Sequence, residues 1–147
     1  MPARMLSYGG DGKAANFMLG QENDEVVVRL RTNGPGTNEG GKLQSGGEPI
    51  QVDKQIRFTP AHYVVTYDIE QVLRLYVDGT RIRETRLDVP GPMTAPRRNW
   101  APDFSLNVAN EGSNDRPWLA TAYFLAVYNS ALDATEMQEY YATGVAQ

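Results

Sequence analysis

The chain has 147 residues, of which 41% are hydrophobic and 22% charged, and its formal net charge is −4. This composition is typical of one globular domain, and the acidic balance argues against nucleic acid and anionic membrane as partners. The sequence contains no cysteine, which excludes disulfides and thiolate chemistry, and no apolar run reaches the ~20 residues that membrane insertion needs.

The first half of the chain predicts short strands at residues 5–7, 16–20 and 25–32. In the third, Val28 and Leu30 share one face while Val27, Arg29 and Arg31 share the other, as in a half-buried antiparallel strand. Residues 33–49 contain six glycines and predict a long loop, either a surface excursion or a binding loop. Residues 50–58 are a weaker strand candidate.

Residues 61–82 predict a meander of strands at 62–67, 73–77 and beyond. The pair Asp78-Gly79 lies between alternating runs and favours a type I′ turn, because both central residues of that turn need positive φ. Residues 89–102 contain four prolines, which excludes a central strand there. Residues 104–108 alternate again. Residues 118–128, WLATAYFLAVY, are apolar on both faces and predict a strand near the middle of a sheet.

One helix is predicted over residues 134–143. Asp133 is a good N-cap, and Glu136 three residues later completes a capping box. Leu132 and Met137 have the spacing of a hydrophobic staple, and Gly144 fits the C′ position that ends a helix.

Several of these motifs resemble one family in the right order. The strand HYVVTY followed by YVDGTRI is similar to the central hairpin of laminin G-like, concanavalin A-like jelly-roll domains, and residues 118–144 resemble their closing strand and short helix. NFMLGQ, RLRTN, Trp100 and VANEGSNDRPW resemble a bacterial branch of these domains. The resemblance implies an all-β antiparallel sandwich of jelly-roll type with one short C-terminal helix, as a single domain over residues 1–147.

The chain departs from the family in two places. Relatives usually carry additional N-terminal strands, so a shortened sandwich, a partner subunit or a neighbouring domain would have to cover the bare sheet edges. The acidic pair of the closing strand is absent, because Ala120 to Phe124 stand there, which puts metal binding by that pair in doubt. The resemblance implies an extracellular or periplasmic location within a larger exported protein, although residues 1–10 lack the apolar core of a signal peptide.

The candidate ligand-binding residues come from the proline-rich loop and the polar loop at residues 107–116. They are Trp100, Asn107, Asn110, Glu111 and Arg116. Trp100 is a candidate sugar-stacking platform, and the oxygen-rich loop would suit calcium, although it lacks the D-x-D-x-D-G spacing. The favoured reading is that Glu111 pairs with Arg116 and orders the approach to Trp118, which is expected to be buried. No cofactor and no metal are predicted.

Catalytic candidates are few. Glycosidases of this broad fold resemble one another in a Glu-x-Asp-x-x-Glu strand, whereas this chain offers Asp68-Ile69-Glu70 with Thr66 in place of the expected acid. His62 is the sole histidine and is interpreted as a structural, hydrogen-bonded residue. The strand arginines predict a solvated charge network rather than a nucleic-acid surface. They are Arg29, Arg31, Arg81, Arg83 and Arg86.

Three functions remain open at this stage. The first is a non-catalytic recognition module that binds carbohydrate or a protein partner through rim loops. The second is an assembly domain, forming homo-oligomers through an exposed sheet edge. The third is a glycoside hydrolase on the same fold. We expect no enzyme activity, no nucleic-acid partner and no membrane insertion.

Overall fold

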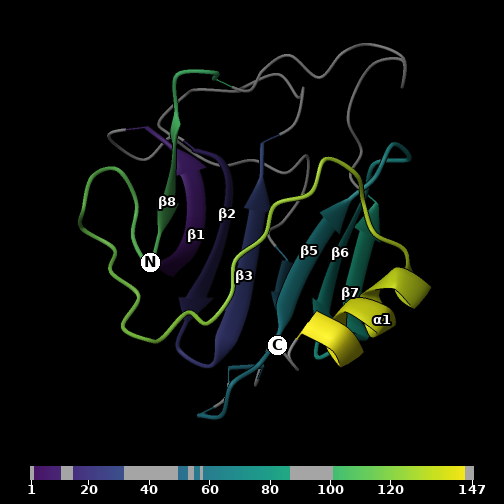
Figure 1. Cartoon of the computed structure of the whole chain (residues 1–147). Coiled ribbons are helices and arrows are strands. Elements are labelled where there is room, and N and C mark those ends of the chain that lie inside the picture. Colours follow the sequence, from purple (N-terminus) through teal and green to yellow (C-terminus); the bar gives the residue numbers. More distant parts are fainter. Residues whose placement is uncertain are drawn as a thin grey trace. The chain divides into compact units, whose positions relative to one another are not determined.

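The computed structural model describes residues 2–10, 15–31, 50–52, 55–56, 58–86 and 101–144. The chain divides into two compact units, which are treated separately here: unit 1 (Met1–Ile56 and Asp88–Thr121) and unit 2 (Arg57–Leu87 and Ala122–Gln147). The described residues form eight strands in two antiparallel sheets and one helix (Figure 1). This agrees with the predicted all-β class with a single short C-terminal helix.

Unit 1 contains a five-stranded sheet with the order β4-β3-β2-β1-β8. Its strands are β1 (Ala3–Gly9), β2 (Ala15–Glu22), β3 (Glu25–Leu30), β4 (Ile50–Val52) and β8 (Ser105–Val108). β4 is much shorter than the candidate strand at 50–58, and Phe58 is fully exposed. The predicted loops at 33–49 and 89–100 lie outside the described residues.

Alternate residues of the unit 1 sheet point to opposite faces, and one of these faces mixes apolar side chains with buried polar ones. The register places Met18 between Arg29 on β3 and Ser7 on β1, and it places Gly20 opposite Arg4. Arg29 lies on the face opposite Val28, as predicted for residues 25–32, but the strand is not half-buried, because Val27 and Val28 point to opposite faces and are both buried. Met18 and Ser7 are fully buried.

Unit 2 contains a three-stranded meander with the order β5-β6-β7. Its strands are β5 (Tyr63–Tyr67), β6 (Val72–Val77) and β7 (Thr80–Arg86). Asp78 and Gly79 connect β6 to β7 with φ values of 51° and 74°, which confirms the predicted turn with two positive φ angles. The central strand β6 supplies the buried apolar side chains, among them Leu73 and Leu75.

The helix α1 (Ala134–Gly144) begins as predicted. The Asp133 carboxylate accepts hydrogen bonds from the backbone N–H groups of Thr135 and Glu136, and Glu136 accepts one from the N–H of Asp133. This reciprocal pair is the capping box. Met137 on the first turn is fully buried, and Gly144 is the last helical residue rather than the residue after the helix.

The closing strand predicted at residues 118–128 is wrong. These residues form no strand in the structure, and Figure 1 draws them as coil. Instead of lying between two layers, the large apolar side chains are exposed, including Leu119 at 93%, Tyr123 at 80% and Phe124 at 69%. We call residues 119–128 the apolar segment; residues 119–121 belong to unit 1 and residues 122–128 to unit 2.

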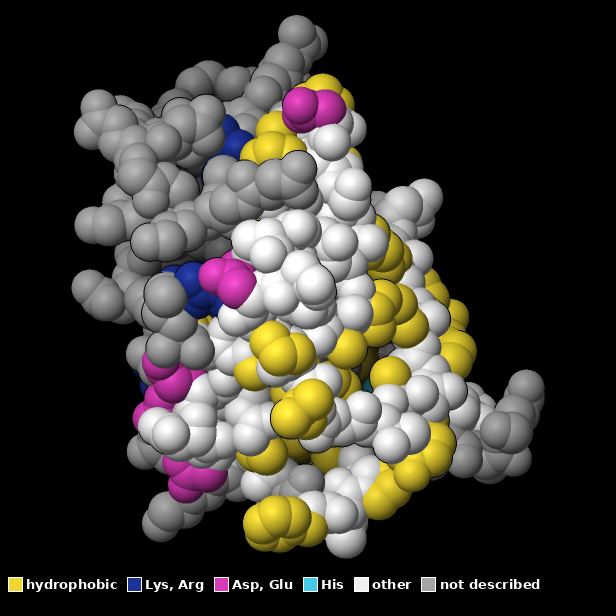
Figure 2. All heavy atoms as spheres, turned by 90° about the vertical axis from the view of Figure 1, so that its left-hand side faces the viewer, with side chains coloured by type: hydrophobic (Ala, Val, Ile, Leu, Met, Phe, Trp, Pro, Cys, Tyr) yellow, Lys and Arg dark blue, Asp and Glu magenta, His cyan; other side chains and the backbone are white. Residues whose placement is uncertain are grey.

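Hydrophobic side chains also reach the surface of unit 1 near β8. Figure 2 shows several such groups on the side of the molecule that carries this strand. Within unit 1, Leu106 and Val108 of β8 are about half exposed, at 47% and 48%. Because β8 pairs only with β1, its outer edge has no strand neighbour among the described residues.

Candidate functional site

The candidate site is the polar stretch that begins at the end of β8 and continues beyond it; we call residues 107–116 the rim loop, and its first two residues belong to β8. The chain turns at Ala109, where φ is 60°, and the side chain of Asn110 then organises the loop. Its Oδ1 accepts hydrogen bonds from the N–H groups of Glu111 (2.9 Å) and Arg116 (3.0 Å). One amide therefore joins the two ends of the loop.

A buried charge cluster holds the rim loop against β1. Glu111 Oε2 lies 2.8 Å from Arg4 Nε, and Glu111 Oε1 lies 2.6 Å from Arg116 Nε. The side chains of all three residues are only 6–7% exposed. The Arg116 contact is an ion pair without hydrogen-bond alignment, whereas the Arg4 contact is a hydrogen bond as well. The favoured pairing of Glu111 with Arg116 is therefore correct, and Arg4 completes it.

Arg4 is fitted closely into unit 1. Its Nη1 donates to the carbonyl of Pro2 at 3.2 Å and contacts Met18 Sδ at 3.1 Å, while its backbone N–H donates to the carbonyl of Arg116. Gly20, directly opposite Arg4 on β2, lies close to the β1 backbone, since a Cβ there would lie 2.5 Å from the Ala3 carbonyl oxygen. Burial lowers the pKa of Arg4, and the bond to Glu111 opposes that shift.

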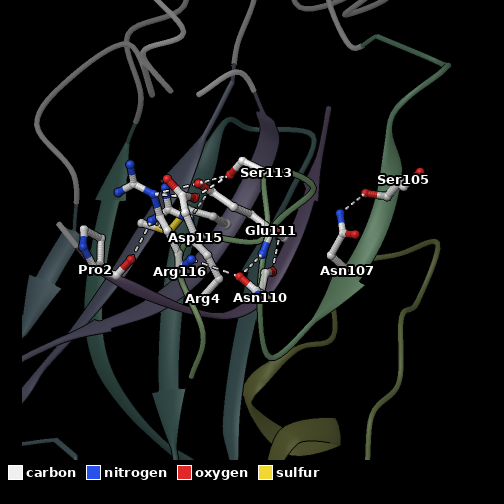
Figure 3. Close-up of polar contacts among 11 residues, drawn as sticks. Pro2, Arg4, Ser105, Asn107, Asn110, Glu111, Ser113, Asp115 and Arg116 are labelled. Carbon is white, nitrogen blue, oxygen red and sulfur yellow. Dashed lines mark hydrogen bonds and ion pairs between the residues drawn. The ribbon is translucent and has the colours of Figure 1, made fainter. Parts of the chain in front are cut away.

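The far end of the rim loop is polar and open to solvent. The Ser113 hydroxyl contacts Glu111 Oε1 at 3.0 Å and also Asp115, and the Asn110 amide donates to Asn114 Oδ1 at 2.7 Å (Figure 3). Ser113, Asn114 and Asp115 are exposed. The hydrogen bond from Ser113 lowers the pKa of Asp115, so this carboxylate is charged at neutral pH. The loop thus presents exposed polar groups on a fixed base.

The structure brings together three of the five predicted site residues. Asn110, Glu111 and Arg116 meet in the rim loop, whereas Asn107 lies on β8, where its amide donates to the carbonyl of Ser105 at 2.9 Å (Figure 3). Trp100 lies outside the described residues. Because Glu111 and Arg116 are buried and paired, they can position a ligand-binding loop but cannot themselves be its contact surface.

Trp118 ends the loop instead of beginning a strand. Its backbone N–H donates to the carbonyl of Ala109 at 2.8 Å, and its indole Nε1 donates to Gln21 Oε1 at 2.9 Å. The side chain is half-buried rather than fully buried. Trp118 therefore anchors the loop to β2, and the apolar segment follows directly after it.

His62, in unit 2, packs against the helix. Its ring stacks on Tyr141 with a centroid separation of 6.0 Å and an interplanar angle of 18°. The backbone N–H of His62 donates to Asp78 Oδ1, but the buried Nδ1 has no hydrogen-bond partner. The prediction of a structural role agrees with this packing, although the imidazole is stacked rather than hydrogen-bonded through Nδ1. Burial lowers the pKa of His62, partly opposed by the Asp78 charge.

The two candidate catalytic carboxylates are each held by a different arginine. Asp68 pairs with Arg74 and accepts the N–H of Val72, which shapes the turn between β5 and β6. Burial raises the pKa of Asp68, but these bonds more than reverse it, so the net shift is downward. Glu70 is exposed and lies 3.9 Å from Arg86. A turn-forming, ion-paired Asp68 is unsuited to act as a general acid.

Part of the predicted network of strand arginines and acidic residues is present in unit 2. Glu84 lies 2.7 Å from both Arg74 and Arg81, and Arg86 approaches Glu70. In unit 1, the buried Nε of Arg29 has no hydrogen-bond partner among the described residues. The surface pairs are exposed enough that each contributes little to stability.

Sequence reasoning missed Arg4. It lies 107 residues from Glu111, and nothing in the residues around it distinguishes it from other strand arginines. Across the described parts of the chain, no three His, Cys, Asp or Glu side chains come together as metal ligands. Both Glu111 oxygens contact arginines, whose positive charge would repel a cation. The geometry of Glu111 therefore gives no support to calcium binding by the rim loop.

Comparison with known proteins gives one family match. The laminin G model described as the concanavalin A-like lectin/glucanases superfamily matches residues 3–138. No curated protein matches the chain significantly. No helix in the described ranges could span a membrane.

Among solved structures, the chain is similar to residues 221–444 of an S-layer domain-containing protein from Clostridium thermocellum. The identity is 14% and the TM-score 0.41, over 96% of this chain and 62% of that one. The chain therefore spans less than two thirds of that structure, and a similarity of this size supports no functional statement.

Proposed function

The chain belongs to the concanavalin A-like lectin/glucanases superfamily, and we propose that it is a non-catalytic module that binds carbohydrate through the rim loop. The observation that carries this proposal is the buried Arg4–Glu111–Arg116 cluster beneath an exposed polar tip. A location outside the cytoplasm stays a prediction from the family resemblance.

The cluster supports binding by fixing the loop before any ligand arrives. A loop whose base is held by buried ion pairs loses less conformational entropy on binding than a free loop does. Glu111 and Arg116 are positioning residues in this proposal. The contacting groups are Asn107 and the exposed tip, Ser113, Asn114 and Asp115, whose amides, hydroxyl and carboxylate suit the hydroxyl groups of a sugar.

The hydrolase alternative has weaker support. A retaining or inverting glycosidase needs two carboxyl groups facing one scissile bond, with one of them able to hold a proton. Asp68 is occupied by Arg74 and has a lowered pKa, and Glu70 is exposed beside Arg86. Asp68 is therefore not in the state that a general acid requires.

The test is direct binding of the purified chain to a panel of polysaccharides by glycan array and affinity electrophoresis. Replacing Asn107→Ala and Asp115→Ala together is expected to weaken binding by at least about 10-fold, the effect of losing one or two hydrogen bonds to charged or amide groups. Glu139→Ala on the exposed side of α1 is the matched control and should leave binding unchanged.

A second variant separates contact from positioning. Glu111→Gln leaves two buried guanidinium groups without their carboxylate, and we expect unit 1 to lose about 3–5 kcal/mol of unfolding free energy. Sugar binding should fall with it, whereas the Asn107 and Asp115 changes should weaken binding without this loss of stability. Full sugar binding by the Asn107→Ala and Asp115→Ala variant would refute the rim loop as the contact surface.

A further inference from the structure

The face of the unit 1 sheet that carries Arg4 also carries Arg29. The register places Met18 of β2 opposite Arg29 of β3, and Met18 Sδ lies 3.1 Å from Arg4 Nη1, so Met18 lies between the two arginines. Arg116 approaches the same place from the rim loop, and Glu111 lies between it and Arg4 (Figure 3). Three guanidinium groups of unit 1 therefore gather around one buried carboxylate.

Arg29 is the member of this group whose charge is not matched. Glu111 contacts Arg4 through Oε2 and Arg116 through Oε1, so both of its oxygens are already engaged. The Nε of Arg29 is buried and has no hydrogen-bond partner among the described residues. Burying a charged donor without a partner costs free energy, so such a group in a folded protein calls for an explanation such as a bound ion or ligand.

The acidic residues on the same face are too distant to balance Arg29. Glu25 of β3 and Glu22 of β2 point to this face, but each lies four residues along its strand from the row of Arg29, a separation of roughly 13 Å. Besides burial, the positive charges of Arg116 and Arg29 lower the pKa of Arg4, so these three groups act on one another. The described residues around Arg29 therefore carry an excess of positive charge.

We propose that Arg29 binds the acidic group, a carboxylate or a sulfate, of the carbohydrate that the rim loop recognises. This inference rests on the proposed function and names the class of sugar. A guanidinium group matches two oxygens of such an anion with parallel N–H donors, and charge-assisted pairs of this kind are about twice as strong as neutral hydrogen bonds. Arg29 is intermediate between buried and exposed, so part of the residue is open to solvent and to a ligand.

Two negative features of the chain do not oppose an acidic ligand. The Asp115 carboxylate at the loop tip accepts a hydrogen bond from Ser113 and lies 3.7 Å from Arg116 Nε, so its charge is partly offset. The net charge of −4 is spread over the whole chain, and charges beyond a Debye length of about 8 Å are largely screened at physiological ionic strength. The groups close to Arg29 therefore decide whether an acidic sugar is attracted.

The first experiment compares acidic polysaccharides with neutral forms of the same backbone by affinity electrophoresis. Polygalacturonate and its methyl ester test a carboxylate, and dextran sulfate and dextran test a sulfate. We expect at least one acidic form to bind at least about 10-fold more tightly than its neutral counterpart, which is the effect of a hydrogen bond to a charged group.

The second experiment removes the guanidinium group. Arg29→Gln should weaken binding of the acidic form about 10-fold and leave binding of the neutral form unchanged. Arg83→Gln is the matched control, because Arg83 is an exposed arginine of β7 in unit 2 and its loss changes the net charge by the same amount. A preference for the acidic form that survives in this control distinguishes a specific contact from general electrostatic attraction.

Stability without ligand distinguishes a binding arginine from a structural one. Because the Nε of Arg29 has no described partner, Arg29→Gln should unfold at the same temperature as the unmodified chain or at a higher one. Glu111→Gln, which leaves Arg4 and Arg116 unpaired, should unfold at a lower temperature. An equally large fall for Arg29→Gln, or its failure to fold, would mean that Arg29 is paired within the chain and would overturn the proposal.

Three binding outcomes would also overturn it. The first is that the neutral forms bind as tightly as the acidic forms. The second is that Arg29→Gln keeps the preference for the acidic form, and the third is that Arg83→Gln loses it to the same extent. If neutral polysaccharide is still bound through Asn107 and Asp115, the carbohydrate proposal stands and only the acidic class fails. Binding of no polysaccharide at all overturns both.

Discussion

Two of the stretches with the sequence pattern of strands behave differently. Residues 61–86 fold into the β5-β6-β7 meander, whereas residues 118–128 remain coil. The meander contains its own partners, since the turn at Asp78 and Gly79 places β7 beside β6. The apolar segment has no such turn and no neighbour close in sequence. Alternating or continuous apolar residues therefore predict an extended backbone, but pairing needs a second strand.

The largest expected difference between the two stretches is the loss of stability when a large apolar side chain is truncated, because one stretch is buried and the other is exposed. Leu75→Ala in β6 removes a side chain that is 0% exposed, and it should cost about 2–5 kcal/mol of unfolding free energy because it leaves a cavity. Leu119→Ala in the apolar segment removes one that is 93% exposed and should change the stability of the monomer by less than about 0.5 kcal/mol. Urea denaturation at low protein concentration compares the two. Equal losses would mean that the segment is packed after all.

The next effect tests the turn that pairs β6 with β7. Gly79→Ala should cost about 1–2 kcal/mol, because an alanine is strained at a φ of 74°. The new Cβ would also lie 3.3 Å from Tyr141, which must shift. Gly144→Ala is the control, since its Cβ meets nothing within 4 Å at the end of α1. Thermal unfolding should show a lower midpoint temperature for Gly79→Ala but not for Gly144→Ala. Equal midpoints would mean that the turn at Gly79 does not stabilise the pairing of β6 with β7.

The smallest effect concerns the packing of α1 on the meander and depends on pH. The pKa of His62 is lowered by burial from its ordinary 6.5, so below that pH the unfolded chain binds more protons than the folded one. The stability due to neutral His62 is complete above pH 6.5 and is lost as pH falls through the lowered pKa. The groups against the ring are Asp78, whose charge opposes the shift, and Tyr141, which stacks on it.

The measurement is the unfolding free energy at several pH values between 5 and 8. His62→Phe keeps an aromatic ring against Tyr141 and should show a shallower decline on acidification than the unmodified chain. Identical pH profiles would contradict a buried neutral His62. A steeper profile for the variant would have the wrong sign and would exclude this assignment.

The interactions that could be predicted from the sequence are those whose partners lie close together along the chain. The capping box of Asp133 and Glu136 and the turn at Asp78 were predictable because their partners lie within a few residues. Glu111 and Arg116 were paired correctly for the same reason, five residues apart. The third member of that cluster, Arg4, was missed because it is 107 residues away in sequence.

The amino-acid sequence by itself determined the antiparallel strands, their faces, the tight turn and the start of the helix, since these depend on φ preferences, side-chain alternation and short-range hydrogen bonds. The tertiary structure alone decided that Glu111 is buried between two arginines and that Trp118 binds Gln21. It also decided that the apolar segment forms no strand within the described part of the chain. The physical reason is that burial and strand pairing are properties of neighbours in space, and residues distant along the chain supply those neighbours only after folding.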